Sequence, residues 1–232
     1  ADGTLLVPRN WKTYTLDTWA HAGWGKLELE AEAVAVLGSV KHVIDIDPEQ
    51  ADELSIREFG GVLKLRHTSN EDKLRLNLEA GFASGDQWDN TPAGRTHISN
   101  ARPLPGEGDT TINAFRFNPE YTIDLILFRE LIGAVTNTTY IKPSMSYDLT
   151  PSITFRAASI VSFANKSVAT PGNGSMYGAE FDGDIGYSSS AFFAGLSYGV
   201  LFPLGALDHP ADPVGGTGPG VRPTSGSQSS AS

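Results

Sequence analysis

Residues 27 to 37 read Leu-Glu-Leu-Glu-Ala-Glu-Ala-Val-Ala-Val-Leu, and this alternation points directly to a β-strand. Successive side chains of a strand lie on opposite faces, so a period of two predicts one apolar face and one that begins with acidic residues. Residues 74 to 82, Leu-Arg-Leu-Asn-Leu-Glu-Ala-Gly-Phe, repeat the pattern with other polar residues. The chain is therefore predicted to be all-β.

Similar segments recur along most of the sequence. We predict ten strands, at residues 14–22, 27–38, 59–68, 74–84, 111–117, 121–128, 139–147, 152–163, 176–187 and 191–202. Most are roughly 9 to 12 residues long. A tilted strand needs about that length to cross a bilayer, whereas strands of soluble sandwiches are usually nearer 5 or 6 residues. The predicted fold is an antiparallel transmembrane up-and-down β-barrel.

The connections between these segments give a second test, because outer-membrane barrels alternate short turns at one end with longer loops at the other. Long connections are expected at 41–58, 85–110 and 165–175, with short turns between them. This alternation requires one more hairpin, made by 111–117 and 121–128 and followed by a longer connection from 129 to 138. Five hairpins then follow one another.

The two ends of the array both fall on the long-loop side, which is unusual for a complete barrel. We expect a barrel domain over residues 1–206 and a flexible tail, rich in Gly, Pro and Ser, over 207–232. The chain is expected to be a fragment of a larger barrel.

Composition excludes several classes of function. The formal net charge of -10 argues against binding to nucleic acid, so any charge-driven partner should be cationic. Because cysteine is absent, neither a disulfide framework nor a thiolate metal site is expected. No apolar run approaches the roughly 18 residues of a transmembrane helix, so a membrane could be crossed only by strands.

The polar faces of the predicted strands supply candidates for the lining of a lumen, where charged rows can select permeants by charge. Pairing of these charges as cross-strand ion ladders, without a role in selection, is an equally good interpretation. The candidates are Glu28, Glu30, Glu32, Lys64, Arg66, Arg75, Glu79, Arg156, Glu180, Asp182 and Asp184.

Two motifs invite other interpretations. Residues 195 to 199, Gly-Leu-Ser-Tyr-Gly, match the nucleophile elbow of hydrolases, with Asp208 and His209 downstream. The elbow needs a strand, a turn and a helix, whereas this motif lies inside an alternating strand, so no enzymatic activity is predicted. The acidic stretch from Asp45 to Glu53 does not match an EF-hand, and no metal or other cofactor is expected.

Residues 27 to 38, 117 to 143 and 177 to 203 resemble a poorly characterised family of outer-membrane barrels known mainly from myxobacteria and related lineages. That family is similar in turn to alginate-export-type porins. The resemblance implies a Gram-negative outer-membrane location and a channel or export role, with no catalytic residues to carry over.

These observations predict a porin-like channel or export conduit in the bacterial outer membrane. Its partners are expected to be the lipid bilayer and a small hydrophilic solute or a polysaccharide. Ten strands would enclose only a narrow interior, since open aqueous channels are typical of about 16 strands. A non-conducting structural or surface-binding barrel, and a soluble β-barrel or sandwich that binds a ligand, are therefore the alternatives.

Overall fold

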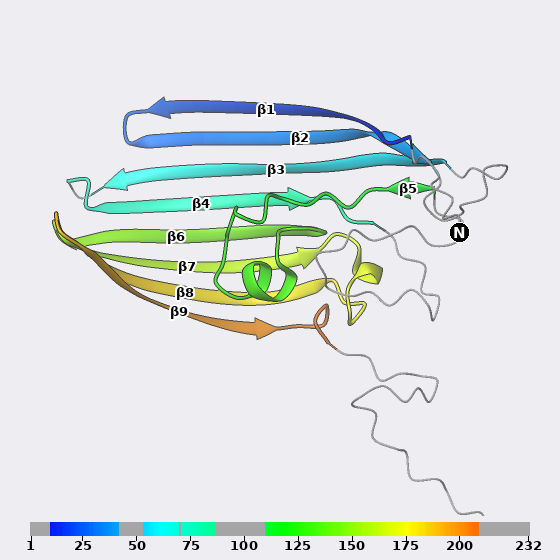
Figure 1. Cartoon of the computed structure of the whole chain (residues 1–232). Coiled ribbons are helices and arrows are strands. Elements are labelled where there is room, and N and C mark those ends of the chain that lie inside the picture. The colour runs from blue at the N-terminus through cyan, green and yellow to red at the C-terminus, as the bar shows by residue number, and fades with distance from the viewer. Residues whose placement is uncertain (1–9, 42–52, 70, 87–109, 209–232) are drawn as a thin grey trace, which may run out of the picture.

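Antiparallel pairing joins each long strand to the next one along the chain (Figure 1). The computed structural model describes residues 10–41, 53–69, 71–86 and 110–208. The sheet has the order β1-β2-β3-β4-β6-β7-β8-β9, with the short β5 beside β3. The strands are β1 (Lys12–Trp24), β2 (Leu27–Lys41), β3 (Glu53–Ser69), β4 (Leu74–Ala83), β5 (Thr111–Ile112), β6 (Thr138–Thr150), β7 (Ile153–Ala164), β8 (Met176–Ser188) and β9 (Phe193–Pro203). The predicted all-β, antiparallel up-and-down class is confirmed.

Register gives the sheet two faces of different chemistry. One row across it pairs Leu29 with Leu65, Leu65 with Leu78 and Leu78 with Pro143. The adjacent row pairs Glu30 with Lys64, Lys64 with Glu79 and Glu79 with Lys142. We call the first, apolar side the outer face and the second the inner face.

The predicted hairpin of residues 111–117 and 121–128 is wrong. Strand β4 pairs directly with β6, from Leu74 opposite Tyr147 to Ala83 opposite Thr138, and this leaves no place in the sheet for two further strands. Only Thr111–Ile112 forms a strand, parallel to β3. The predicted longer connection at 129–138 is likewise part of the single link between β4 and β6. Short and long connections still alternate, now with eight strands in the main path.

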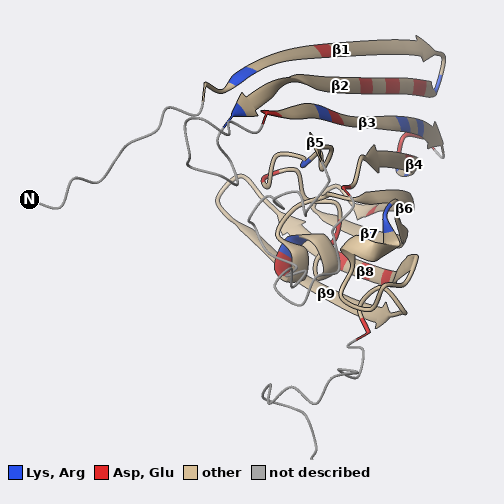
Figure 2. Ribbon diagram, turned by 90° about the vertical axis from the view of Figure 1, so that its right-hand side faces the viewer, with Lys and Arg blue, Asp and Glu red and all other residues tan. Residues whose placement is uncertain are grey.

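Residues 113–137, here called the inner segment, fold back over the inner face instead of joining the sheet. They contain a six-residue π-helix, Leu127–Ile132. Figure 2 shows the sheet curving around this segment. The run from Leu125 to Phe128 is apolar at every position. A strand with this sequence would place apolar side chains in the lumen as well as in lipid, so the run is more stable when it is buried.

The buried core lies between the inner segment and the wall of strands. It contains Ala83, Phe117, Ile123, Leu127, Phe128, Ile132, Val135, Tyr140, Ile160, Tyr177 and Ala206. A smaller cluster of Val40, Leu54, Ile56 and Ile112 lies where β5 meets β3. Both clusters are toward the end of the sheet that carries the long connections, so that end of the inner face is packed and apolar.

Strands β1 and β9 form the two edges of the sheet, which is open between them as a piece of a barrel would be. Most of the predicted tail, residues 209–232, lies outside the described residues. Within the described part of the chain, no helix has the length and apolar character needed to cross a membrane.

Candidate functional site: the inner face and the inner segment

The sheet register puts all the candidate lumen residues on the inner face. Glu28 and Arg66 lie in one row with Asn77, and Arg75 lies in another with Ser146, Arg156 and Asp184. Cross-strand ion pairs join several of them. Lys64 Nζ lies 3.7 Å from a Glu30 carboxylate oxygen, Arg66 lies 3.4 Å from Glu28, and Arg156 lies 2.9 Å from Asp184. The half of the inner face near the short turns therefore carries an ion ladder.

Arg75 pairs with a residue that the sequence interpretation missed. Its guanidinium donates to both carboxylate oxygens of Asp148, at 2.9 and 2.7 Å, and Thr154 donates to the same carboxylate. The predicted strand ends at residue 147, but Asp148 lies within β6, close to a register shift between β6 and β7. This bidentate pair fastens β4 to β6 beside the short turns.

Glu180 has a different role from the other candidates because its side chain is 1% exposed. One carboxylate oxygen accepts hydrogen bonds from the backbone N–H groups of Leu125 and Ile126, at 2.9 and 2.7 Å. The other accepts one from Leu127 N–H at 2.9 Å. The first N–H groups of a helix have no partner within it and favour an anion, so a carboxylate from β8 holds the π-helix against the wall.

Asp124 completes this attachment from within the inner segment. Its carboxylate accepts from the N–H of Phe128, at 2.9 and 3.1 Å to the two oxygens, and from the N–H of Arg129 at 3.0 Å. Burial raises the pKa of the Asp124 carboxyl to about 6; the Phe128 N–H bond opposes this shift and the nearby Glu180 charge adds to it. Two acidic side chains thus meet at one helix end.

A second attachment lies nearer β3. The hydroxyl groups of Tyr121 and Tyr140 both donate to the same oxygen of Glu79, at 3.0 and 2.6 Å. Lys64 Nζ lies 4.9 Å from the centre of the Tyr121 ring. Burial and the neighbouring Glu79 raise the pKa of the Tyr121 hydroxyl above its usual range, so Tyr121 stays a hydrogen-bond donor.

The start and the end of the inner segment are also fixed. The Asp86 carboxylate accepts from Asn113 N–H at 3.0 Å, and Thr136 donates to Phe115 C=O at 2.7 Å. The Phe115 ring lies directly over Gly60 of β3, where an added Cβ would overlap it. The inner segment is therefore a built part of the fold, held at several points along its length.

In the part of the chain that the structure describes, cavities lie along the inner face, and three of them bear on the site. One, of about 220 Å³, lies between β2, β3 and residues 115–121 of the inner segment. A second, of about 270 Å³, shares Glu30 and Lys64 with it and extends over β4 and β6 toward the short turns. The third, of about 260 Å³, shares Asn77, Lys142 and Ser144 with the second and reaches Asp184 and Ser197. The cavities adjoin, so open space follows the inner face beside the inner segment.

Several residues of this site were missed from the sequence alone. Lys142 lies in a predicted strand opposite Glu79, and its charge on an otherwise uncharged polar face was a usable signal. Asp124 is the single charge in an apolar run, which is also a recognisable pattern. Tyr121 and Tyr140 carried no such signal, because their role depends on contacts with distant residues.

The hydrolase-like motif has no hydrolase setting. Residues 195 to 199 lie inside β9, and Ser197 is on the inner face opposite Asp184. Asp208 lies in an exposed position after a turn, and His209 lies outside the described residues. Of the acidic stretch, only Glu53 is described, and its carboxylate lies 3.5 Å from Lys41.

Comparison with known proteins gives little beyond the fold. No protein-family model matches the sequence, and a search of curated proteins finds no match. Among solved structures, a NanC porin in a rhombohedral crystal form is similar at 10% sequence identity and a TM-score of 0.37, over 82% of this chain and 81% of that chain. The predicted resemblance to the myxobacterial family and to alginate-export-type porins finds no support in these comparisons.

Proposed function

We propose that this chain forms all or part of an outer-membrane β-barrel of a Gram-negative bacterium, with its outer face in contact with lipid. The observation that supports contact with lipid is the exposure of large apolar side chains along the whole outer face. Tyr14, Leu196 and Tyr198 are 75%, 70% and 72% exposed. Others with large exposed fractions are Leu16, Leu63, Leu65, Leu76, Leu78, Phe82, Ile141, Phe181, Ile185 and Phe202.

An apolar surface that spans the whole sheet is far larger than the exposed patches of ordinary soluble proteins, and a soluble barrel or sandwich would bury it. The opposite arrangement is expected in a membrane, where the apolar face meets lipid and the polar face lines the interior. The strands of the main path, 10 to 17 residues long, are also long enough to cross a bilayer when tilted.

Aromatic side chains of the outer face gather toward both ends of the strands. Trp24, Tyr187 and Phe192 lie near the short turns. Tyr14, Phe82, Phe163 and Phe202 lie near the long connections. Two belts of this kind are expected where a barrel passes through the two membrane interfaces.

The proposed activity is passive passage of small hydrophilic solutes, or of a polysaccharide, through the space beside the inner segment. The adjoining cavities and the charged inner face support this role. The test is the conductance of the full chain reconstituted into planar bilayers. Stable unitary currents are the expected result, and their absence from correctly folded protein would contradict the channel role.

A non-conducting barrel is the second candidate, and the inner segment is the observation that favours it. Glu180, Asp124 and Glu79 fix that segment across the part of the inner face formed by β4 and β6–β8. If the space beside it is closed in the membrane, the barrel would act through its loops. Folded protein without conductance, together with loop-dependent retention of a partner, would identify this function.

A further inference from the structure

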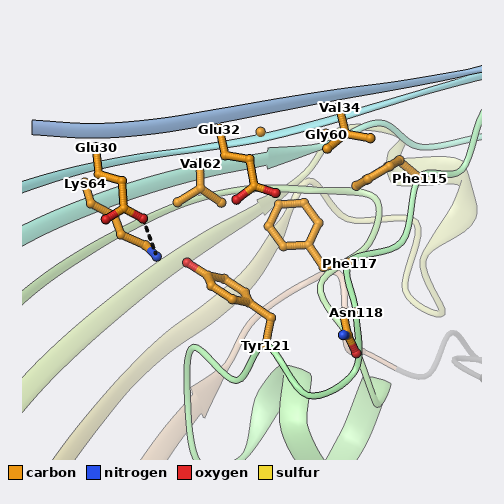
Figure 3. A pocket seen from close by; sticks show the side chains of 11 residues that line it. Glu30, Glu32, Val34, Gly60, Val62, Lys64, Phe115, Phe117, Asn118 and Tyr121 are labelled. Carbon is orange, nitrogen blue, oxygen red and sulfur yellow. Dashed lines mark ion pairs between the residues drawn. The ribbon is translucent and has the colours of Figure 1, made fainter. Parts of the chain in front are cut away.

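The cavity between the inner segment and strands β2 and β3 has an unequal balance of charge. We propose that it is a cation-preferring constriction and that Glu32 sets the preference. This inference rests on the proposed channel function and adds to it the sign of the permeant ion. Figure 3 shows the Glu32 carboxylate pointing into the cavity, toward the Phe117 and Tyr121 rings.

This cavity is the smallest of the three described above, at about 220 Å³. Phe115, Phe117 and Tyr121 line it on the side of the inner segment, and Gly60 and Gly61 line it on the wall. Together with its neighbour, the cavity follows β2 from Glu28 to Val34, about 20 Å at roughly 3.3 Å per residue. The Glu32 side chain is exposed and lines this cavity, so its carboxylate is accessible to an ion that passes beside the aromatic rings.

The charges around the cavity do not cancel. Two carboxylates line it, those of Glu30 and Glu32, and Lys64 is the cation among its lining residues. Lys64 lies 3.7 Å from Glu30 and against the Tyr121 ring, so that pair is neutral. Glu79 does not line the cavity; it accepts hydrogen bonds from the Tyr121 and Tyr140 hydroxyls and lies opposite Lys142 in the sheet. In the described part of the chain, the Glu32 carboxylate has no hydrogen bond or ion pair and is therefore available to a mobile cation.

The adjoining second cavity lacks this imbalance. In the cavity over β4 and β6, Glu28, Glu30 and Glu79 are matched by Lys64, Arg66 and Lys142. The cavity that reaches β9 is lined by Asp124, Asp182 and Asp184 together with Arg129, Arg156 and the Lys142 that it shares with the second cavity. An ion that passes from the second cavity into the first thus meets a carboxylate, that of Glu32, which no lysine or arginine lining either cavity pairs with.

The first experiment measures ion selectivity from the reversal potential of the full chain in planar bilayers under a KCl gradient. We expect wild type to prefer K⁺ over Cl⁻, and Glu32→Gln to lower the permeability ratio by about twofold or more. Glu32→Lys should reverse the preference. The control Glu53→Gln removes the same charge at the long-connection end of β3, outside the cavity, and should leave the ratio unchanged.

A second experiment reads the local potential without any need for current. The chain has no cysteine, so Val34→Cys, which lines the same cavity, gives one site for thiol labelling. A cationic methanethiosulfonate should react faster than an anionic one of similar size. Adding Glu32→Gln should reduce the ratio of the two rates by about twofold or more.

The two experiments separate the inference from the channel role. If no current is seen but the labelling ratio depends on Glu32, the channel function and the ion preference during permeation are both contradicted. The attraction of cations to the cavity would still stand. Current with an unchanged permeability ratio in Glu32→Gln, or a labelling ratio that ignores Glu32, would overturn the inference and leave the channel standing.

Discussion

The position of the inner segment depends most on Glu180, whose carboxylate accepts three backbone hydrogen bonds from it. Replacing it by Gln leaves one acceptor oxygen for three N–H groups and turns an amide NH₂ toward backbone donors. We expect Glu180→Gln to lower the free energy of opening of the inner segment by about 2 kcal/mol, or roughly 30-fold in the opening equilibrium. Trypsin cleavage after Arg129, followed by mass spectrometry, measures this change.

The matched control is Glu120→Gln, which removes an exposed carboxylate from the same segment. Its cleavage rate should stay near that of wild type. Equal rates in Glu180→Gln and wild type would show that the Glu180 carboxylate does not hold the segment.

Asp124 should make this attachment depend on pH. Its pKa rises from an ordinary value of 3.8 to about 6 on folding, so the folded form binds the proton more tightly. The stabilisation is complete below about pH 4 and is lost as pH rises through about 6. The nearby Glu180 charge adds to the rise in the pKa of Asp124, and the Lys142 charge opposes it. The Asp182 carboxyl faces the same region.

The expected result is slower trypsin cleavage after Arg129 at pH 5 than at pH 7.5, once the rates are corrected for the enzyme's own pH dependence with an unfolded peptide. Asp124→Asn removes the titrating group and should flatten the profile. A wild-type profile as flat as that of the variant would show that Asp124 ionises normally in the folded chain.

Gly60 is required where the Phe115 ring lies against β3. A methyl group there would overlap the ring, so Gly60→Ala should destabilise the fold by about 1–3 kcal/mol. Gly183→Ala is the control, because its Cβ would meet its nearest neighbour, the Arg156 carbonyl oxygen, at 3.9 Å. Thermal loss of SDS resistance measures both, and Phe115→Leu should recover part of the loss in Gly60→Ala.

Each strand of the sheet should tolerate charge on one face only. Tyr198 and Ser197 are neighbours in the middle of β9, on the outer and the inner face respectively. Arginine near the bilayer midplane costs about 2–4 kcal/mol on a lipid-facing position. Tyr198→Arg should therefore impair folding into lipid vesicles by that amount, while Ser197→Arg, opposite Asp184, should fold almost normally. Similar losses in both variants would contradict the assignment of the faces.

The strands were predictable because their alternation is local. In β2 the same face carries Glu28, Glu30 and Glu32 and then Val34 and Val36, and this alternation fixes the strand without any knowledge of its neighbours. The change from glutamate to valine on that face also marks where the inner segment begins to cover the wall. That signal was present in the sequence but was not used.

The inner segment was not predictable by the same means. Its first part alternates weakly, and the run Leu125–Phe128 is apolar on both sides, so a strand and a buried helix fit it equally well. What decides between them is Glu180, which lies more than 50 residues later and meets the segment only in the folded state. Because this contact cannot be seen in the sequence, Glu180 was predicted to line a lumen.

The whole molecule has an exposed apolar outer face and an inner face that combines packed and charged regions. A structure of this kind is stable only if something apolar covers the outer face, and the proposed cover is lipid. The cavities, the inner segment and the Glu32 constriction all gain their proposed roles from that arrangement.

The most direct test of the lipid contact is gel migration of the unheated and the heated chain, refolded with detergent or kept in plain buffer, together with far-ultraviolet circular dichroism of both samples. We expect a compact, SDS-resistant band and a β spectrum only with detergent, with the band shifting after heating. A cooperative β-fold in buffer alone would contradict the account, because the outer face would then be covered by protein and not by lipid.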